Sequence, residues 1–208
     1  MNIVLIGPQG SGKGTQAKRI EKKYGYKHIS TGEIYRRKVR EGDKLALRMK
    51  EYVDKGGLIP DEIVVDMIKG LLSDKGNILD GIPRTIKQAE LLDKLIKIDL
   101  AIELKLSDEI AVKRISSRRE CAKCGAVYGY SNPPKKPSIC DICQGPLEQR
   151  EDDKPDAVLK RLATYREKTE PIVEYYKSRG IAKSVDASKD IESVFKDICK
   201  IIDSQKTA

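Results

Sequence analysis

Short apolar runs alternate along the chain with stretches in which apolar residues recur every three or four positions. The runs predict strands near residues 2–6, 27–29, 77–80, 100–106 and 181–185. The periodic stretches predict helices near residues 13–24, 31–42, 44–55, 63–72, 85–96, 107–119, 159–176 and 191–202. In the fourth run Ala101, Glu103 and Lys105 alternate with larger apolar residues, so we expect a strand with unequal faces. This order predicts an α/β fold, a doubly wound parallel sheet of five strands with helices on both faces.

A glycine-rich loop separates the first predicted strand from the first predicted helix, and it reads Gly7-Pro8-Gln9-Gly10-Ser11-Gly12-Lys13-Gly14-Thr15. Glycines allow consecutive backbone N–H groups to face one anion, and the positive end of the following helix adds to the attraction. The loop departs from the usual phosphate-loop pattern at Gly14, where Ser or Thr normally follows the lysine. The loop predicts a nucleotide site with the candidate residues Gly10, Ser11, Gly12, Lys13, Gly14 and Thr15.

Periodicity stops between about residues 120 and 156, where the chain is rich in Cys, Gly and Pro. Four cysteines in this segment have the spacing C-x2-C-x15-C-x2-C, and they are Cys121, Cys124, Cys140 and Cys143. In a reducing compartment such pairs predict thiolates around one tetrahedral zinc ion, not disulfides. Four thiolates leave no open ligand position, so we expect a structural zinc that holds a segment with few apolar residues. Cys199 lies in the last helical repeat and is expected to be a core residue.

Asp80 and several arginines are further candidates for phosphate chemistry. Asp80 ends a predicted strand, where it could face Mg²⁺ or could cap the following turn. Arg114 and Arg118 lie four residues apart, which predicts one face of one helix, either as an anion site or as a solvated surface. Arg150 and Arg161 follow the cysteine segment and could converge on the same anion, because a guanidinium fits phosphate oxygens and stays charged.

Composition narrows the class of protein. The chain has 208 residues, of which 39% are hydrophobic and 35% charged, and this is typical of one folded α/β domain with insertions. No apolar stretch is long enough to span a bilayer and the chain begins with a predicted strand, so we expect a cytoplasmic protein without a signal peptide. The net charge of +9 suits a polyphosphate ligand as well as a nucleic acid. His28 is the single histidine and is expected to be structural, which argues against histidine acid–base catalysis.

Four separated motifs together resemble the adenylate kinase family nearly end to end. The glycine loop 7–15 is similar to that family's phosphate loop, including the extra glycine at position 14. The segments Ser30-Thr31-Gly32-Glu33 and Gly57-Leu58-Ile59-Pro60-Asp61-Glu62 resemble the start and the end of its AMP-binding segment. Residues 80–89 are similar to its AMP motif, with Ile82 in place of the usual Phe, and residues 121–143 resemble the metal-stabilised lid of its long form.

The resemblance implies three parts: a core P-loop domain, a helical AMP-binding insert and a small zinc-type lid. Their expected ranges are 1–29, 60–120 and 157–208 for the core, 30–59 for the insert and 121–156 for the lid. It also implies reversible transfer of a phosphoryl group from ATP to AMP to give two ADP, with Mg accompanying ATP. We expect these nucleotides to be its partners, with no nucleic acid and no membrane, and we expect a monomer.

The resemblance assigns roles to individual residues. ATP would be held by Gly10, Ser11, Gly12, Lys13, Gly14, Thr15, Arg114, Arg118 and Tyr128. AMP would be held by Thr31, Arg36, Gly57, Ile59, Gly81, Arg84, Gln88, Arg150 and Arg161, with Gln88 on the adenine edge. The catalytic set would be Lys13, Arg84, Arg118, Arg150 and Arg161, while Asp80 would hold Mg through water. Asp152 and Asp153 would organise arginines, and Gly129 stands where the family often has a histidine.

Two alternatives remain open. The first is a related kinase that phosphorylates UMP or CMP or uses GTP, although Gln88 favours adenine; a panel of nucleoside monophosphates separates these cases. The second is a nucleic-acid-binding NTPase with a zinc ribbon, which requires basic and aromatic residues around the ribbon. Lys123, Lys135 and Lys136 are present, but only Tyr128 and Tyr130 offer rings there. Oligonucleotide binding at moderate salt would distinguish this class from a kinase.

Overall fold

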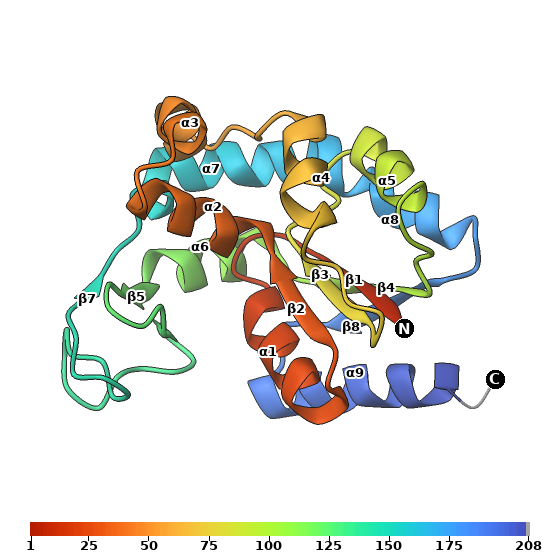
Figure 1. Ribbon diagram of the computed structural model, residues 1–208. Helices are drawn as coiled ribbons and strands as arrows, with labels where there is room; N and C mark the ends of the chain where they lie inside the picture. The colour runs from red at the N-terminus through yellow and green to blue at the C-terminus, as the bar shows by residue number, and fades with distance from the viewer. Residues whose placement is uncertain (207–208) are drawn as a thin grey trace.

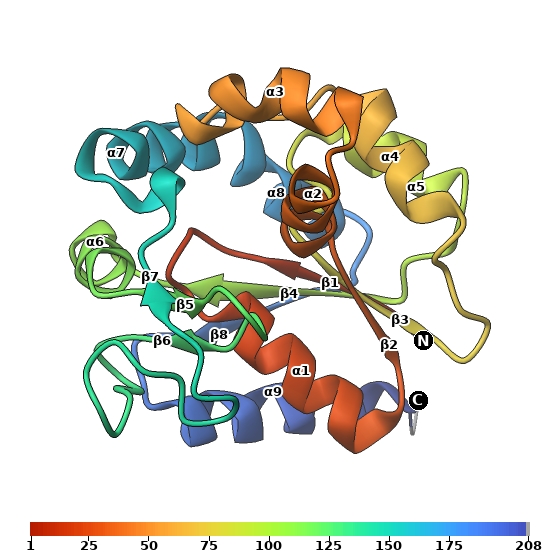
Figure 2. The same ribbon diagram turned by 60° about the vertical axis from the view of Figure 1, so that its left-hand side comes forward.

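The computed structural model describes residues 1–206 and is built around one parallel sheet. The sheet has five strands in the order β2-β3-β1-β4-β8, and every neighbouring pair is parallel (Figures 1 and 2). The strands are β1 (Asn2–Ile6), β2 (Lys27–Ser30), β3 (Asn77–Asp80), β4 (Leu100–Lys105) and β8 (Ala182–Asp186). The predicted doubly wound α/β fold is therefore confirmed.

Helices cover both faces of the sheet, and Figure 2 shows α1 and α9 on one face and the other long helices on the opposite side. The helices are α1 (Lys13–Tyr24), α2 (Thr31–Arg40), α3 (Lys44–Asp54), α4 (Asp61–Lys69), α5 (Ile86–Asp93), α6 (Asp108–Ser116), α7 (Pro155–Thr164), α8 (Pro171–Lys177) and α9 (Ile191–Lys206). Side chains of Ser30, Thr85 and Ser107 accept hydrogen bonds from backbone N–H groups of the first turns of α2, α5 and α6. These residues fix where the helices begin, because the first N–H groups of a helix lack partners within it.

Alternate residues of the central strands belong to two separate hydrophobic cores. Ile3 and Leu5 of β1 pack with α1 and α9, whereas Val4 and Ile6 pack with α4, α5 and α8. Both faces of a parallel sheet are covered in this way, so its strands are buried throughout. This explains why the prediction of unequal faces for β4 is wrong: all its residues except Lys105 are buried, Glu103 included.

Several predicted helices end earlier than their patterns suggested, and α5 ends at Asp93. Helix α6 ends at Ser116, so the prediction that Arg114 and Arg118 share one face of one helix is wrong. The chain turns extended at this point because residues from Arg119 on pair with two other strands. Helix α4 ends at Lys69, and the predicted stretch 159–176 is divided by a π-helical turn, η2 (Tyr165–Thr169).

The segment without periodicity forms a small antiparallel sheet with the strand order β6-β5-β7. Its strands are β5 (Arg119–Cys121), β6 (Val127–Tyr128) and β7 (Leu147–Glu148), followed by a short 3-10 turn, η1 (Glu151–Asp153). The buried cluster inside it is small and consists of Cys121, Tyr128, Cys140 and Leu147. Among the described residues, no helix combines the length and apolarity needed to cross a bilayer.

We expect Ile102→Ala to lower the free energy of unfolding by about 2–5 kcal/mol, because it leaves a cavity in a packed core. Ile102 lies in β4, an interior strand of the sheet, and is 0% exposed. Leu159→Ala on α7 is the matched control, because that leucine is 62% exposed and its loss should cost less than about 1 kcal/mol. Chemical denaturation measures both, and equal losses would contradict the assignment of the core.

Candidate active site

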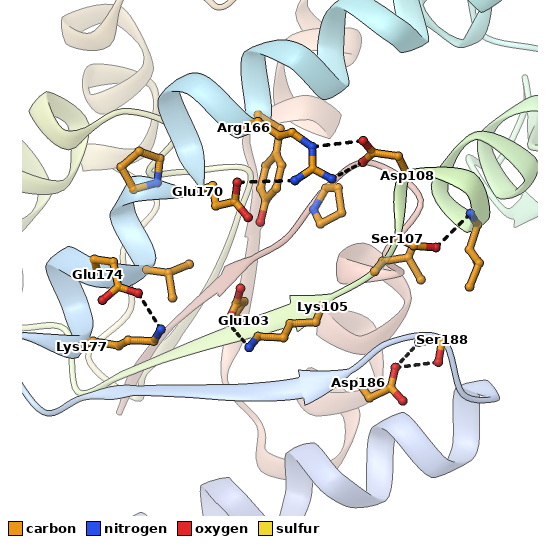
Figure 3. A pocket seen from close by; sticks show the side chains of 16 residues that line it. Glu103, Lys105, Ser107, Asp108, Arg166, Glu170, Glu174, Lys177, Asp186 and Ser188 are labelled. Carbon is orange, nitrogen blue, oxygen red and sulfur yellow. Dashed lines mark hydrogen bonds and ion pairs between the residues drawn. The ribbon is translucent and has the colours of Figure 1, made fainter.

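Two large cavities open at the carboxyl ends of the sheet strands, and their charges differ. The cavity with a volume of about 790 Å³ is lined by the glycine loop, the start of α2, the end of β3 and the cysteine segment. The other, of about 1050 Å³, lies between β4, α6, η2 and α8 (Figure 3). Its cations are already paired with carboxylates, as Arg166 is with Asp108 and Glu170. Acidic side chains outnumber basic ones around it, so the first cavity is the better site for a polyphosphate.

The glycine loop surrounds the Lys13 ammonium group at one end of the first cavity. Gly12 has a φ of 88°, a left-handed conformation that glycine adopts without steric cost, and helix α1 begins at the next residue. Lys13 Nζ donates to the carbonyl oxygens of Gly7 (2.7 Å) and Pro8 (2.9 Å). Burial lowers the pKa of Lys13 to about 8; the charge of Asp80 acts in the opposite direction, and the charges of Arg84, Arg161 and Arg118 lower the pKa further. An anion bound here would favour the charged ammonium group.

Gly14, the unusual residue of the loop, lies against Asp80. A Cβ atom at position 14 would come within 3.3 Å of Asp80 Oδ2, so glycine keeps the space beside this carboxylate clear. Asp80 ends β3 and lies beside His28, whose Nε2 is 3.5 Å from Oδ2. Burial would raise the pKa of Asp80, but His28 and the charges of Lys13 and Arg84 lower it below its usual value. Asp80 is thus an ionised carboxylate next to the phosphate loop, which suits a hydrated divalent cation.

The Arg84 side chain enters the cavity from the loop after β3, and hydrogen bonds hold both its guanidinium group and its backbone. Its Nε donates to the Gly81 carbonyl oxygen (2.9 Å), which also accepts from Thr31 Oγ1 (2.9 Å). The backbone N–H of Arg84 donates to Gln88 Oε1 (2.7 Å), and Thr169 Oγ1 donates to its carbonyl oxygen (2.9 Å). Burial lowers the pKa of Arg84 below that of a free arginine, and Asp80 opposes this change. One hydrogen bond therefore orients the guanidinium group, and two others fix the backbone that carries it.

Four residues assigned to AMP do not line this cavity, and they are Thr31, Gly57, Ile59 and Gln88. Gln88 is 1% exposed, and its side-chain nitrogen donates to Asp61 Oδ1 (2.9 Å). In this structure Gln88 therefore braces the backbone of Arg84 and the start of α4. The roles of these residues toward AMP remain predictions.

Carboxylates hold the arginines that face the phosphate loop. Arg118 forms a bidentate ion pair with Asp153, with Nε 2.7 Å from Oδ2, and the Asp153 side chain is 0% exposed. Arg161 contacts Asp152 at 2.8 Å and Asp153 at 3.3 Å. Burial lowers the pKa of Arg161 to about 10, while these aspartates oppose the change. The expectation that Asp152 and Asp153 organise arginines is confirmed.

Arg114 reaches a different part of the cavity from Arg118. Its guanidinium donates to the carbonyl oxygens of Ala187 (2.9 Å) and Ser188 (3.2 Å), at the carboxyl end of β8. Lys189 in the loop after β8 and Ile191 at the start of α9 also line the cavity. Sequence reasoning missed these residues, although their position directly after a predicted strand could have indicated them.

The four cysteines of the small sheet come together as predicted. Their Sγ atoms all lie within 4.8 Å of one another, with Cys121 and Cys143 3.4 Å apart and Cys124 and Cys140 3.5 Å apart. Thiolates around a tetrahedral zinc ion stand about 3.8 Å apart, so this arrangement fits one metal ion. A hydrogen bond from Tyr128 lowers the pKa of Cys140 to about 6, and the thiolate is the form that binds metals. The cluster can therefore hold one metal ion with four sulfur ligands.

The parallel sheet, the phosphate loop and the cations around one cavity define a P-loop phosphotransferase. The chain belongs to the adenylate kinase family, whose model matches residues 5–181. The adenylate kinase of Archaeoglobus fulgidus is 47% identical over 218 residues, and the alignment covers 100% of both chains. Those of Methanosarcina mazei and Methanosarcina barkeri are 48% and 49% identical, each covering 97% of this chain and 98% of the relative. The protein is thus a nucleoside monophosphate kinase that converts ATP and AMP to two ADP.

We expect the purified protein to carry one metal ion per chain, zinc or iron, in the cysteine cluster. Cys124→Ser should abolish this stoichiometric metal, because three thiolates bind it more weakly, and elemental analysis measures the ratio. Chelation should also make residues 121–156 sensitive to protease. Cys199→Ala is the control, since this buried cysteine lies in α9, outside the cluster, and should leave the metal in place. Freshly purified protein without zinc or iron would contradict the prediction.

Proposed function

We propose that the cavity of about 790 Å³ binds both nucleotides and that phosphoryl transfer takes place among its cations. The observation that carries this proposal is the convergence on this cavity of Lys13 and six arginines from separate elements: Arg36, Arg84, Arg114, Arg118, Arg150 and Arg161. Cations from separate elements around one cavity suit two substrates whose phosphates meet in that cavity. The glycine loop would hold the triphosphate, and the segment from α2 to α5 would hold AMP.

The chain's residues would accelerate the reaction by positioning and electrostatics. The phosphate of AMP is already ionised at neutral pH, so the attacking oxygen needs no general base, which fits a chain with one histidine. Lys13, Arg118 and Arg161 would meet the charge that spreads over the transferring group. Because carboxylates fix these guanidinium groups beforehand, little reorganisation is needed in the transition state.

Metal ions complete the proposal in two separate places. Mg²⁺ bound with ATP would neutralise phosphate charge, and Asp80 is the carboxylate that would hold it through water. The cysteine cluster would hold a structural zinc that stabilises residues 121–156 as a lid. Lid residues such as Tyr128 and Asn132 line the cavity, so a closed lid would keep water from the transferring phosphoryl group. A monomeric, cytoplasmic enzyme with Mg, zinc and adenine nucleotides as its partners stays our expectation.

We expect Lys13→Met or Arg84→Ala to lower ADP formation from ATP and AMP by about 10²–10³-fold or more. Each cation should contribute roughly 3–4 kcal/mol to the transition state, by analogy with an oxyanion-hole donor. Arg166→Ala is the matched control, because this half-exposed arginine is paired with Asp108 in the second cavity. A coupled assay for ADP measures all three. Near-normal turnover in either active-site variant would refute the assignment.

Binding of the triphosphate should weaken as the pH rises through about 8. The free protein carries the Lys13 charge below this pKa and loses it above, whereas bound phosphate favours the charged form. The dissociation constant for ATP should therefore rise by up to about tenfold per pH unit between roughly pH 8 and 9.5, with proton uptake on binding. Calorimetry in buffers of different ionisation enthalpy detects both effects.

Lys13→Arg is the control for this pH dependence, because a guanidinium group stays charged throughout the range. We expect its affinity for ATP to lack the decline above pH 8, whatever its absolute value. A wild-type dissociation constant that stays constant up to about pH 9.5 would contradict the lowered pKa of Lys13.

A further inference from the structure

A carboxylate outside the assigned site residues lies between two of the cavity's arginines. Glu120 belongs to β5 at the base of the small sheet, and its side chain is 15% exposed. Its Oε2 accepts a hydrogen bond from Arg150 Nε and lies 3.9 Å from Arg36 Nε. The two arginine side chains are 14% and 26% exposed, so the group is largely shielded from solvent.

The three residues come from separate parts of the chain. Arg36 lies in α2, Glu120 in β5, and Arg150 follows β7 (Figure 1). Glu120 therefore joins the AMP-binding segment to the cysteine-containing sheet through one carboxylate. It differs from Asp152 and Asp153, because they belong to η1 and contact Arg118 and Arg161.

Removal of this carboxylate would leave like charges close together. Burial lowers the pKa of Arg36 and that of Arg150, and in both cases Glu120 acts in the opposite direction. Arg118 adds to the lowering at both residues. In the free protein Glu120 thus partly balances the positive charge of Arg36 and Arg150. A bound phosphate would provide the same kind of balance.

We propose that Glu120 is a positioning residue that competes with the phosphate of AMP for Arg36 and thereby sets the affinity for AMP. When the phosphate binds Arg36, Glu120 keeps Arg150 as its remaining partner. Binding of AMP thus breaks the contact between Arg36 of α2 and Glu120 of β5. Phosphate and carboxylate are both anions, and their approach to the same guanidinium group raises the free energy of the bound state. This inference rests on the proposed assignment of Arg36 to AMP.

The test compares variants that remove the charge with one that keeps it. Glu120→Gln and Glu120→Val should lower the dissociation constant for AMP about tenfold, as measured by calorimetry, because the competing charge is gone. Valine is favoured in strands, so Glu120→Val is a second uncharged variant, and unlike glutamine its side chain forms no hydrogen bonds. Glu120→Asp keeps the charge, so its affinity should stay within about threefold of the wild type. The dissociation constant for ATP should change less than about twofold in all of them, a selectivity that general destabilisation would not produce.

Glu148→Gln is the matched control. Glu148 lies in β7 opposite Glu120 in the strand register and is exposed. Its loss changes the net charge equally but should leave both dissociation constants unchanged. If Glu120→Gln and Glu120→Val leave AMP binding within about twofold of the wild type or weaken it, the proposal is wrong. It is also wrong if Glu148→Gln tightens AMP binding to the same degree.

A double-mutant cycle with Arg36→Ala separates this inference from the site assignment on which it rests. Arg36→Ala alone should weaken AMP binding at least tenfold, and in that background Glu120→Gln should lose most of its effect. Unchanged AMP binding in Arg36→Ala would refute the assignment of Arg36, whereas weaker binding with an undiminished effect of Glu120→Gln would refute the competition alone. The ADP-forming activity of the wild-type enzyme tests the reaction independently of both.

Discussion

The mutual repulsion of cations around one cavity is the constraint on which the rest of the structure depends. Two like charges about 6 Å apart in a partly buried site repel by roughly 3 kcal/mol at an effective dielectric constant near 20. The protein offsets this cost with carboxylates: Asp80 beside Lys13, Asp153 on Arg118, Asp152 on Arg161 and Glu120 on Arg150. The arginines are consequently oriented in the free protein, while Lys13 is left with a pKa of about 8. A nucleotide's phosphates would supply the negative charge that the cavity lacks.

The fold brings these cations together because all strands of the main sheet are parallel. The loops after β1, β3 and β8 leave the sheet at its carboxyl edge, and each contributes residues to the same cavity. The other cations come from segments that the sheet does not contain: α2 carries Arg36, and the two sides of the cysteine-containing sheet carry Arg118 and Arg150. Charges on separate segments can meet across a bound substrate. This division suits an enzyme with two substrates, because each segment can contribute charge to a different part of the bound nucleotides.

Local patterns in the sequence predicted most of the fold and much of the cavity. The phosphate loop and the cysteine spacing are each recognised from about ten to twenty residues of sequence. Over so short a stretch the geometry of the chain itself limits how the residues can be arranged in space. Arg118 was predicted on the same helix face as Arg114, yet α6 ends at Ser116 and the two side chains contact different partners. Glu120 gave no signal at all, because an isolated acidic residue beside a cysteine is compatible with an exposed position. Its partners lie 84 and 30 residues away, at Arg36 and Arg150.

The sequence by itself determined the order of elements, the phosphate loop, the four cysteines that can hold a metal ion and membership of the adenylate kinase family. These features depend on the periodicity of apolar residues and on short motifs, which are local properties. Only the tertiary structure decided which carboxylate holds which arginine, that a side chain at position 14 would crowd Asp80 and that Gln88 braces Arg84. Those contacts join residues far apart in the chain. Their partners are chosen by how the elements pack and by the electrostatics of a shared, partly buried space.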